Sequence, residues 1–447
     1  MNYIPVNKKD KEKMLEVIGV KTVDELLSLQ IPEVVRAKKL NIADGISEQE
    51  VLELFKNYAS KNKSNLVCFR GAGIYDHFVP SVVDEVVGRS DFWTAYTPYQ
   101  AEASQGTLQA IFEYQSMICE LTGLDTANAS MYDGASAVAE AVLLAVRTSK
   151  KNKVIISKAL HPEYINVVET YTQKLNIELI KIDIDEKTGS MSQNILENKM
   201  ADDIACVVVQ SPNFFGIVED MQVLSQTAKT KNALFVSVVN PVSLGILKTP
   251  GEYGADIAVG EGQVFGNQMY LGGSTFGFMA VRKALEWKMP GRVVGKTTDK
   301  NGKTGFVLTL QSREQHIRRE KATSNICTNS ALNALTACVY LACLGNSGIK
   351  ELAEVNISKA RYAFNLIKNL DGFTPLFGNS LFFNEFIFKT TKNIKKIEKE
   401  LLKKNILGPL SLAKTDKKYK DCIMFAVTEK RTKQEIDSLV DILKNAK

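Results

Sequence analysis

Histidine, tryptophan and proline are scarce in this chain, which holds 3 histidines, 2 tryptophans and 11 prolines among 447 residues. The histidines form no HxxxH pair, which argues against a zinc site, and we expect no metal. The 7 cysteines include no CxxC pair, so we expect reduced, mostly buried thiols. Reduced thiols are typical of a cytoplasmic protein.

Long apolar runs are also missing. No uninterrupted apolar stretch reaches about 18 residues, the length of a membrane-spanning helix. Residues 1–14 lack the apolar core of a signal peptide. The net charge is only +6, and we interpret the scattered lysines as solvated helix faces. We therefore expect neither a membrane nor a nucleic acid as a partner.

Apolar residues, in contrast, make up 45% of the chain, enough to bury a large core. Within residues 1–68 they recur at helical spacing, and Ser47 with Glu50 forms a capping box before one such segment. We predict that residues 1–68 form an N-terminal helical arm. Nothing catalytic stands out in it, and we expect it to pack on a partner subunit.

From residue 69 to 311, strand-like apolar runs alternate with helical segments. This alternation predicts a large α/β domain with a mostly parallel sheet that is covered on both faces. The strand-like runs are residues 153–158, 177–183, 205–212, 233–241, 255–260 and 274–283. Residues 312–447 are predicted to hold connecting helices and a small C-terminal α+β domain.

A polar, aromatic loop precedes the helical pattern that begins near residue 105. Pro98 and Gly106 interrupt this loop, and such a segment is suited to closing over a small ligand. Its candidate site-lining residues are Tyr96, Thr97, Tyr99, Gln100, Glu102 and Gln105. We predict that the loop is the contribution of this chain to a site at a subunit interface.

Four stretches closely resemble one enzyme family. They are FRGAGIYDHFVP (69–80), RSDFWTAYTPYQAEASQGTLQAIFEYQ (89–115), ICELTGLDTANASMYDGASA (118–137) and REQHIRREKATSNICT (313–328). Together they resemble the P-protein of the glycine cleavage system, a glycine dehydrogenase (decarboxylating). The length is similar to that of the first, alpha-type subunit in the split form of this family.

This resemblance implies an α/β fold like that of the type I pyridoxal phosphate (PLP) enzymes, with a large mostly parallel-sheet domain and a small C-terminal α+β domain. It implies a holoenzyme that decarboxylates PLP-bound glycine and passes the aminomethyl group to the lipoyl arm of the H-protein. The implied partners are glycine, the lipoyl H-protein and a beta-type P-protein subunit, in an α₂β₂ arrangement.

A PLP enzyme of this fold needs a helix N-terminus for the phosphate, a ring over the pyridine, a carboxylate on the ring nitrogen and a lysine bonded to the cofactor. The resemblance places Gly134, Ala135 and Ser136 at the phosphate position and His161 at the ring position. Local sequence alone equally allows a plain turn with an N-cap at residues 133–136. At position 161 it favours a surface-loop histidine.

The other two positions lack the required chemistry. Asn240 stands where the family has its carboxylate, and a neutral amide does not stabilise a charged pyridine ring. Gln263 stands where the family has its lysine, and an amide nitrogen cannot form the bond to the cofactor. We therefore expect no catalytic residue and no bound cofactor in this chain alone, because the beta-type partner subunit carries the PLP.

Two other functions stay open. One is a self-sufficient PLP-dependent decarboxylase or lyase that uses an unexpected lysine, of which Lys248 is the nearest. The other is a purely structural pseudo-subunit. The block 313–328 also allows two interpretations: a helical face paired with acidic neighbours, or a basic surface that attracts an acidic lipoyl carrier protein. Its basic residues are Arg313, His316, Arg318, Arg319 and Lys321.

Overall fold

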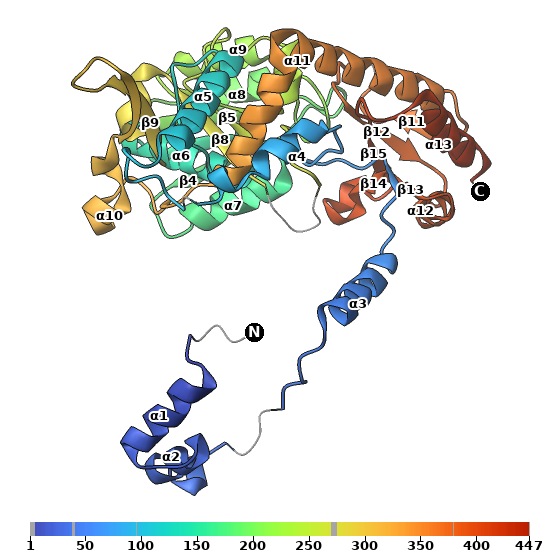
Figure 1. The fold of residues 1–447 in the computed structure, drawn as a ribbon. Coiled ribbons are helices and arrows are strands. Elements are labelled where there is room, and N and C mark those ends of the chain that lie inside the picture. Colours follow the sequence, from blue (N-terminus) through green and yellow to red (C-terminus); the bar gives the residue numbers. More distant parts are fainter. Residues whose placement is uncertain (1–4, 38–40, 95, 270–274, 379, 447) are drawn as a thin grey trace. The chain divides into compact units, whose positions relative to one another are not determined.

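The computed structural model describes residues 5–37, 41–94, 96–269, 275–378 and 380–446 (Figure 1). The chain divides into two compact units, Met1–Ser64 and Asn65–Lys447, and each is described by itself. Division of the chain into functional domains at residues 68 and 311 stays a prediction.

The first unit consists of short capped helices. They are α1 (Lys8–Ile18), α2 (Val23–Gln30), a 3₁₀ turn (Glu33–Val35) and α3 (Glu48–Ser60). The capping box of Ser47 and Glu50 is confirmed at the start of α3. Among the described residues of this unit, Val20 is the only buried one. The helices therefore form locally, while their apolar side chains stay exposed.

The second unit is built on a seven-stranded sheet of order β2-β8-β7-β6-β5-β3-β4. The five strands from β7 to β4 are parallel to one another, and β8 and β2 add an antiparallel edge. The mostly parallel sheet is thus confirmed. The strands are β2 (Thr126–Ala127), β3 (Lys153–Ser157), β4 (Glu178–Ile182), β5 (Ile204–Ser211), β6 (Leu234–Val239), β7 (Ile257–Glu261) and β8 (Gly277–Val281).

Helices cover both faces of this sheet. Along β3, Val154 and Ile156 pack in a core with α6 (Gly134–Ser149) and α7 (Pro162–Thr172). Ile155 points to the other face and packs with α8 (Gln193–Lys199) and α9 (Met221–Lys229). Because both faces of the strands are buried, their sequences are continuous apolar runs.

A second group of helices lies beside the sheet. It comprises α4 (Ser81–Val87), α5 (Gln105–Thr122) and α11 (Ala331–Lys368). Helix α11 has a kink at Gly345, where φ is 59°. By length and composition alone, α11 is the one helix among the described residues that could cross a membrane. Its buried residues include Ala337 and Tyr340, however, and these pack in a core with α5.

Along the sequence, between strand β8 and helix α11, the chain forms a β-hairpin that the apolar pattern does not predict. Strands β9 (Val293–Thr298) and β10 (Thr304–Thr309) pair antiparallel. Only the first two residues of β9 are buried, so the hairpin lacks the continuous apolar run of the central strands. The four-residue helix α10 (Gln315–Arg318) follows it.

The C-terminal part is the expected small α+β structure. Its sheet has the order β11-β12-β15-β14, and its phenylalanines, among them Phe386, Phe388 and Phe425, form the core. A separate parallel pair, β1 with β13, joins the start of the second unit to this region. The elements are β1 (Val67–Cys68), β11 (Phe373–Pro375), β12 (Glu385–Thr390), α12 (Ile394–Lys403), β13 (Ile406–Leu407), β14 (Leu410–Ser411), β15 (Cys422–Ala426) and α13 (Lys433–Asn445).

Candidate functional site

The positions predicted for a cofactor gather at one edge of the large sheet. His161 follows β3, Asn240 follows β6 and Gln263 follows β7, and the carboxyl ends of these parallel strands share that edge. The N-terminus of α6 lies there as well, since the Gly134 N–H donates a hydrogen bond to Glu261 at the end of β7.

The start of α6 is a capped helix N-terminus. The Asp133 carboxylate accepts a hydrogen bond from Ser136 N at 2.7 Å, and the Ser136 hydroxyl accepts one from Asp133 N at 3.1 Å. The Ser136 hydroxyl is therefore engaged with its own cap. Of the three residues predicted for a phosphate, Gly134 and Ser136 already donate their N–H groups to carboxylates of the chain.

Glu261 is the residue that sequence reasoning missed here. Its Oε2 accepts from Gly134 N at 3.0 Å, and its Oε1 accepts from Gln263 N at 3.1 Å and from Phe276 N at 3.2 Å. Burial raises the pKa of Glu261 to about 7, although these backbone hydrogen bonds favour the ionised form. The only signal in the sequence is an acidic residue at the end of an apolar strand.

His161 caps α7 and lies against another ring. Its Nδ1 accepts from Glu163 N at 3.2 Å and its Nε2 lies 3.1 Å from Ala72 O, which assigns the proton to Nε2. The Tyr164 ring lies 4.8 Å away at 32° to the imidazole. Burial lowers the pKa of His161, so the ring is neutral near pH 7.

Both amides at the remaining positions are engaged in structural hydrogen bonds. Asn240 Oδ1 accepts from Val242 N at 3.1 Å and caps a 3₁₀ turn. Gln263 is 2% exposed, and its Nε2 donates to Tyr75 O at 3.1 Å and Asn267 O at 2.7 Å. Its Oε1 accepts from Tyr75 N at 3.0 Å, so every polar atom of this side chain is satisfied.

The loop of residues 69–78 connects this edge to the small sheet. Glu385 in β12 accepts from Ala72 N at 2.6 Å and from the Tyr75 hydroxyl at 2.7 Å. Burial raises the pKa of Glu385 to about 7. Because Tyr75 also pairs with Gln263, the loop is fixed from both sides.

These residues do not fit a PLP molecule. At the positions predicted for the lysine and the ring-nitrogen carboxylate the chain has hydrogen-bonded amides, and the helix N-terminus predicted to hold the phosphate already binds a carboxylate. A Cβ at Gly134 would clash with the Tyr164 hydroxyl, so little room remains beside the helix. We assign no chemical step to PLP in this chain.

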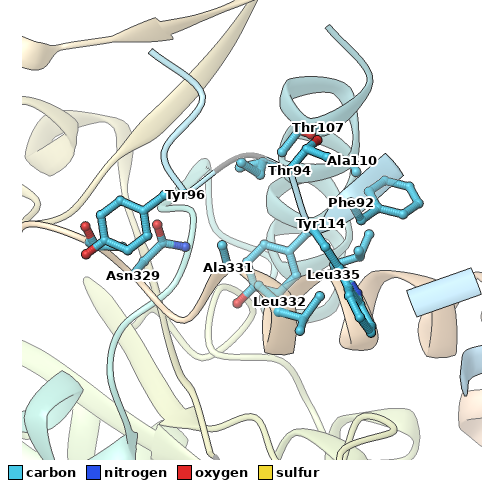
Figure 2. A pocket seen from close by; sticks show the side chains of 14 residues that line it. Phe92, Thr94, Tyr96, Thr107, Ala110, Tyr114, Asn329, Ala331, Leu332 and Leu335 are labelled. Atoms are coloured by element: carbon cyan, nitrogen blue, oxygen red, sulfur yellow. The ribbon is translucent and has the colours of Figure 1, made fainter. Parts of the chain in front are cut away.

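Of the predicted loop, Tyr96 lies at a pocket of about 510 Å³ (Figure 2). Residues 92–94 and 96, α5 and the start of α11 line this pocket, mostly with apolar side chains. Figure 2 shows the Tyr96 ring beside Asn329 at one side of it. Tyr96 is 82% exposed, whereas Tyr114 at the floor is 1% exposed and its hydroxyl has no hydrogen-bond partner among the described residues.

The other loop candidates do not line this pocket. The Tyr99 hydroxyl accepts from Arg292 Nη2 at 3.0 Å, and the Gln105 amide pairs with the backbone of Phe306 in β10. These two side chains hold the loop to Arg292, which directly precedes β9, and to β10. Thr97 is half-buried, while the side chains of Gln100 and Glu102 are exposed.

The basic block 313–328 is divided between core and surface. Arg313 is buried and donates to Leu310 O and Gly291 O, so its assignment to a basic surface or helical face was wrong. His316, Arg318, Arg319 and Lys321 are exposed. The His316 ring lies 5.8 Å from that of Tyr99, which places the exposed part of the block beside the loop.

Comparison with protein families and known proteins gives a consistent result. Residues 1–443 match the model of the family described as glycine cleavage system P-protein. The chain is 63% identical, over all of both sequences, to the probable glycine dehydrogenase (decarboxylating) subunit 1 of Endomicrobium trichonymphae.

Solved structures agree with this result. The crystal structure of a glycine decarboxylase (P-protein) of the glycine cleavage system, in inhibitor-bound form, superposes with a TM-score of 0.89 at 39% identity and covers 99% of both chains. A C-DES variant with glycine covalently linked to its PLP cofactor has a TM-score of 0.63 at 14% identity, over 86% of this chain and 97% of that one. At this low identity, the second similarity shows only that the chain shares the fold of PLP enzymes.

Proposed function

The chain belongs to the glycine cleavage system P-protein family, and on that premise we propose that it is the subunit of a glycine dehydrogenase (decarboxylating) that carries no PLP. The observation that carries this proposal is Gln263. The sequence resemblance puts it at the position of the family's lysine, and in the structure its amide is buried with every polar atom hydrogen-bonded. A beta-type subunit then supplies the lysine and the cofactor.

In this proposal, glycine and the lipoyl arm of the H-protein are the substrates of the complete enzyme, in the cytoplasm. PLP in the partner subunit supplies the electron sink that lets the glycine carboxylate leave as CO₂. The aminomethyl group is then transferred to the lipoyl arm. The role of the present chain is to complete the site and to position its substrates.

An exposed aromatic surface supports the requirement for a partner. Trp93, Tyr96 and Leu332 line the same pocket and are 65%, 82% and 44% exposed. Contiguous exposed apolar side chains of this size mark interaction surfaces. We propose that the beta-type subunit covers this surface in an α₂β₂ assembly, with Tyr96 at the edge of the shared site.

The exposed basic residues beside the loop support a role in H-protein binding. His316, Arg318, Arg319 and Lys321 lie together in sequence, and the His316 ring contacts Tyr99. Such a cluster attracts an acidic carrier protein and raises its association rate. The lipoyl arm would then enter next to Tyr96.

The test compares the purified chain with the reconstituted complex. Alone, the chain should show no borohydride-reducible PLP absorbance, no modified lysine by mass spectrometry and no glycine–bicarbonate exchange. With the beta-type subunit, exchange should appear. A chain that carries reducible PLP on Lys248 or another lysine would establish the self-sufficient enzyme instead.

A further inference from the structure

The N-terminus of α6 has the geometry of an anion site. A helix N-terminus presents free N–H groups and a partial positive charge, and glycine there allows an anion to approach. In this chain the first helical residue is Gly134, and its N–H points at the Glu261 carboxylate. The anion at this helix is therefore part of the protein.

The Glu261 carboxylate is fixed by hydrogen bonds from three separate segments of the chain. Its two oxygens accept from Gly134 N in α6, Gln263 N after β7 and Phe276 N before β8, at 3.0, 3.1 and 3.2 Å. These backbone N–H groups are donors of the kind that a phosphate would need. With the carboxylate in place, they are already satisfied.

Tyr164 fills the remaining space next to the helix. A Cβ added to Gly134 would clash with the Tyr164 hydroxyl and lie 3.1 Å from Glu261 Cβ. The Tyr164 ring in turn lies against His161, the residue at the position of the ring that covers a cofactor. Two side chains of this protein thus occupy the phosphate position and the space beside it.

We propose that the Glu261 carboxylate is an internal substitute for a ligand phosphate, and that with Tyr164 it excludes phosphorylated ligands from the N-terminus of α6. This inference rests on the proposed cofactor-free role. It adds a second reason, besides the missing lysine, why this chain would not bind PLP. Restoring a lysine alone would leave the phosphate position closed. Removing the carboxylate opens that position to an external anion.

Inorganic phosphate is the probe, because it needs neither a lysine nor space for a pyridine ring. Its binding to the full chain is followed by ³¹P line broadening and by a saturable rise in melting temperature. Glu261→Ala should bind phosphate at least tenfold more tightly than the wild type. Pyridoxine 5′-phosphate, which has no aldehyde to react with lysines, should bind to Glu261→Ala combined with Tyr164→Ala.

Glu219→Ala is the matched control. Glu219 is also a buried carboxylate whose pKa burial raises to about 7, but the donors to this carboxylate, Met191 N and Asn213 Nδ2, lie outside the helices, so it satisfies no first-turn N–H of a helix. This variant should not gain phosphate binding. A gain of the same size in Glu219→Ala would show general loosening and overturn the proposal.

A folded Glu261→Ala chain with wild-type phosphate affinity would also overturn it. Where the alanine variant does not melt cooperatively, Glu261→Ser, which keeps a small polar group at the strand end, is read in the same way. These outcomes are separate from the proposed function. If the wild-type chain carries covalent PLP, the cofactor-free role is refuted. If the wild type carries no PLP and Glu261→Ala binds no phosphate, only the role of Glu261 is refuted.

Discussion

The Gln263 side chain makes three hydrogen bonds, two of them to Tyr75 in the loop of residues 69–78 and one to Asn267 O, and a lysine cannot reproduce all three. Its carbonyl oxygen accepts from Tyr75 N, and lysine has no acceptor at all. The side chain is 2% exposed, so a charge there would lose its hydration. At this position, predicted to correspond to the family's lysine, the side chain makes structural contacts.

Gln263→Lys should therefore destabilise the chain without creating a PLP enzyme. We expect a loss of about 3 kcal/mol in the free energy of unfolding, because the variant buries an uncompensated charge and leaves Tyr75 N unpaired. Urea denaturation measures this loss. The control is Gln226→Lys on the exposed side of α9, which should change stability by less than about 0.5 kcal/mol. Turnover of the isolated Gln263→Lys chain with PLP would contradict this prediction.

Tyr96 and Tyr99 belong to one loop but should differ when their hydroxyls are removed. Tyr99→Phe deletes one hydrogen-bond acceptor of the buried Arg292, which should cost about 2 kcal/mol of stability. Tyr96→Phe removes a hydroxyl from a side chain that is 82% exposed, so the melting temperature should not change. If Tyr96 orients substrate, exchange by the reconstituted complex should fall about tenfold, or about 1.4 kcal/mol.

The two variants control for each other in this comparison. Unchanged exchange with Tyr96→Phe would assign that ring to the subunit interface and favour the purely structural role. A loss of stability in Tyr96→Phe without one in Tyr99→Phe would reverse our assignment of the two side chains.

At the scale of elements, apolar runs predicted the central strands well. The runs at 153–158, 205–212 and 233–241 correspond to β3, β5 and β6. Strands that are buried on both faces have continuous apolar sequences, which are easy to locate. The β9–β10 hairpin was missed, since its outer residues are polar. The contact between Glu385 and the loop could not be predicted, because 313 residues separate Glu385 from Ala72 and neither shows a local signal.

Strand β12 carries a carboxyl group that makes stability depend on pH. Burial raises the pKa of Glu385 from 4.5 to about 7, so the folded chain holds this proton more tightly than the unfolded chain does. Between pH 4.5 and 7 the folded state binds more protons, and stability falls as the pH rises. The full difference corresponds to about 3 kcal/mol.

Glu385→Gln should remove that part of the pH dependence. The amide oxygen can keep the Ala72 N–H, and the Tyr75 hydroxyl can rotate to accept from the amide nitrogen. The variant should therefore gain stability relative to the wild type as the pH rises from 5 to 8, measured by urea denaturation at each pH. Glu85→Gln on exposed α4 should follow the wild-type curve. Parallel curves for Glu385→Gln and wild type would refute the prediction.

At the scale of the whole molecule, the second unit has extensive cores, whereas the first has almost none. Several apolar residues of the first unit are exposed, among them Val17 at 88%, Leu29 at 73% and Val34 at 91%. Capping boxes and local hydrogen bonds account for its helices, but not for so much exposed apolar surface. The sequence predicted the helices of this arm, because caps and helical spacing are local signals. The surface that we expect them to bind could not be predicted, because it belongs to another subunit of the assembly.

We expect the arm to contribute to binding of the beta-type subunit and little to the stability of this chain. Leu29→Asp and Val34→Asp place charges on side chains that are already exposed, so the melting temperature of the isolated chain should stay within about 1 °C, since surface substitutions are nearly neutral. Affinity for the beta-type subunit, measured by analytical ultracentrifugation, should fall at least tenfold in the double variant, because a charge would be buried in an apolar contact. Lys9→Glu on exposed α1 is the control for charge alone and should bind like the wild type. Wild-type affinity in the double variant would show that the arm does not bind the partner, and a large drop in melting temperature would show that it stabilises its own chain.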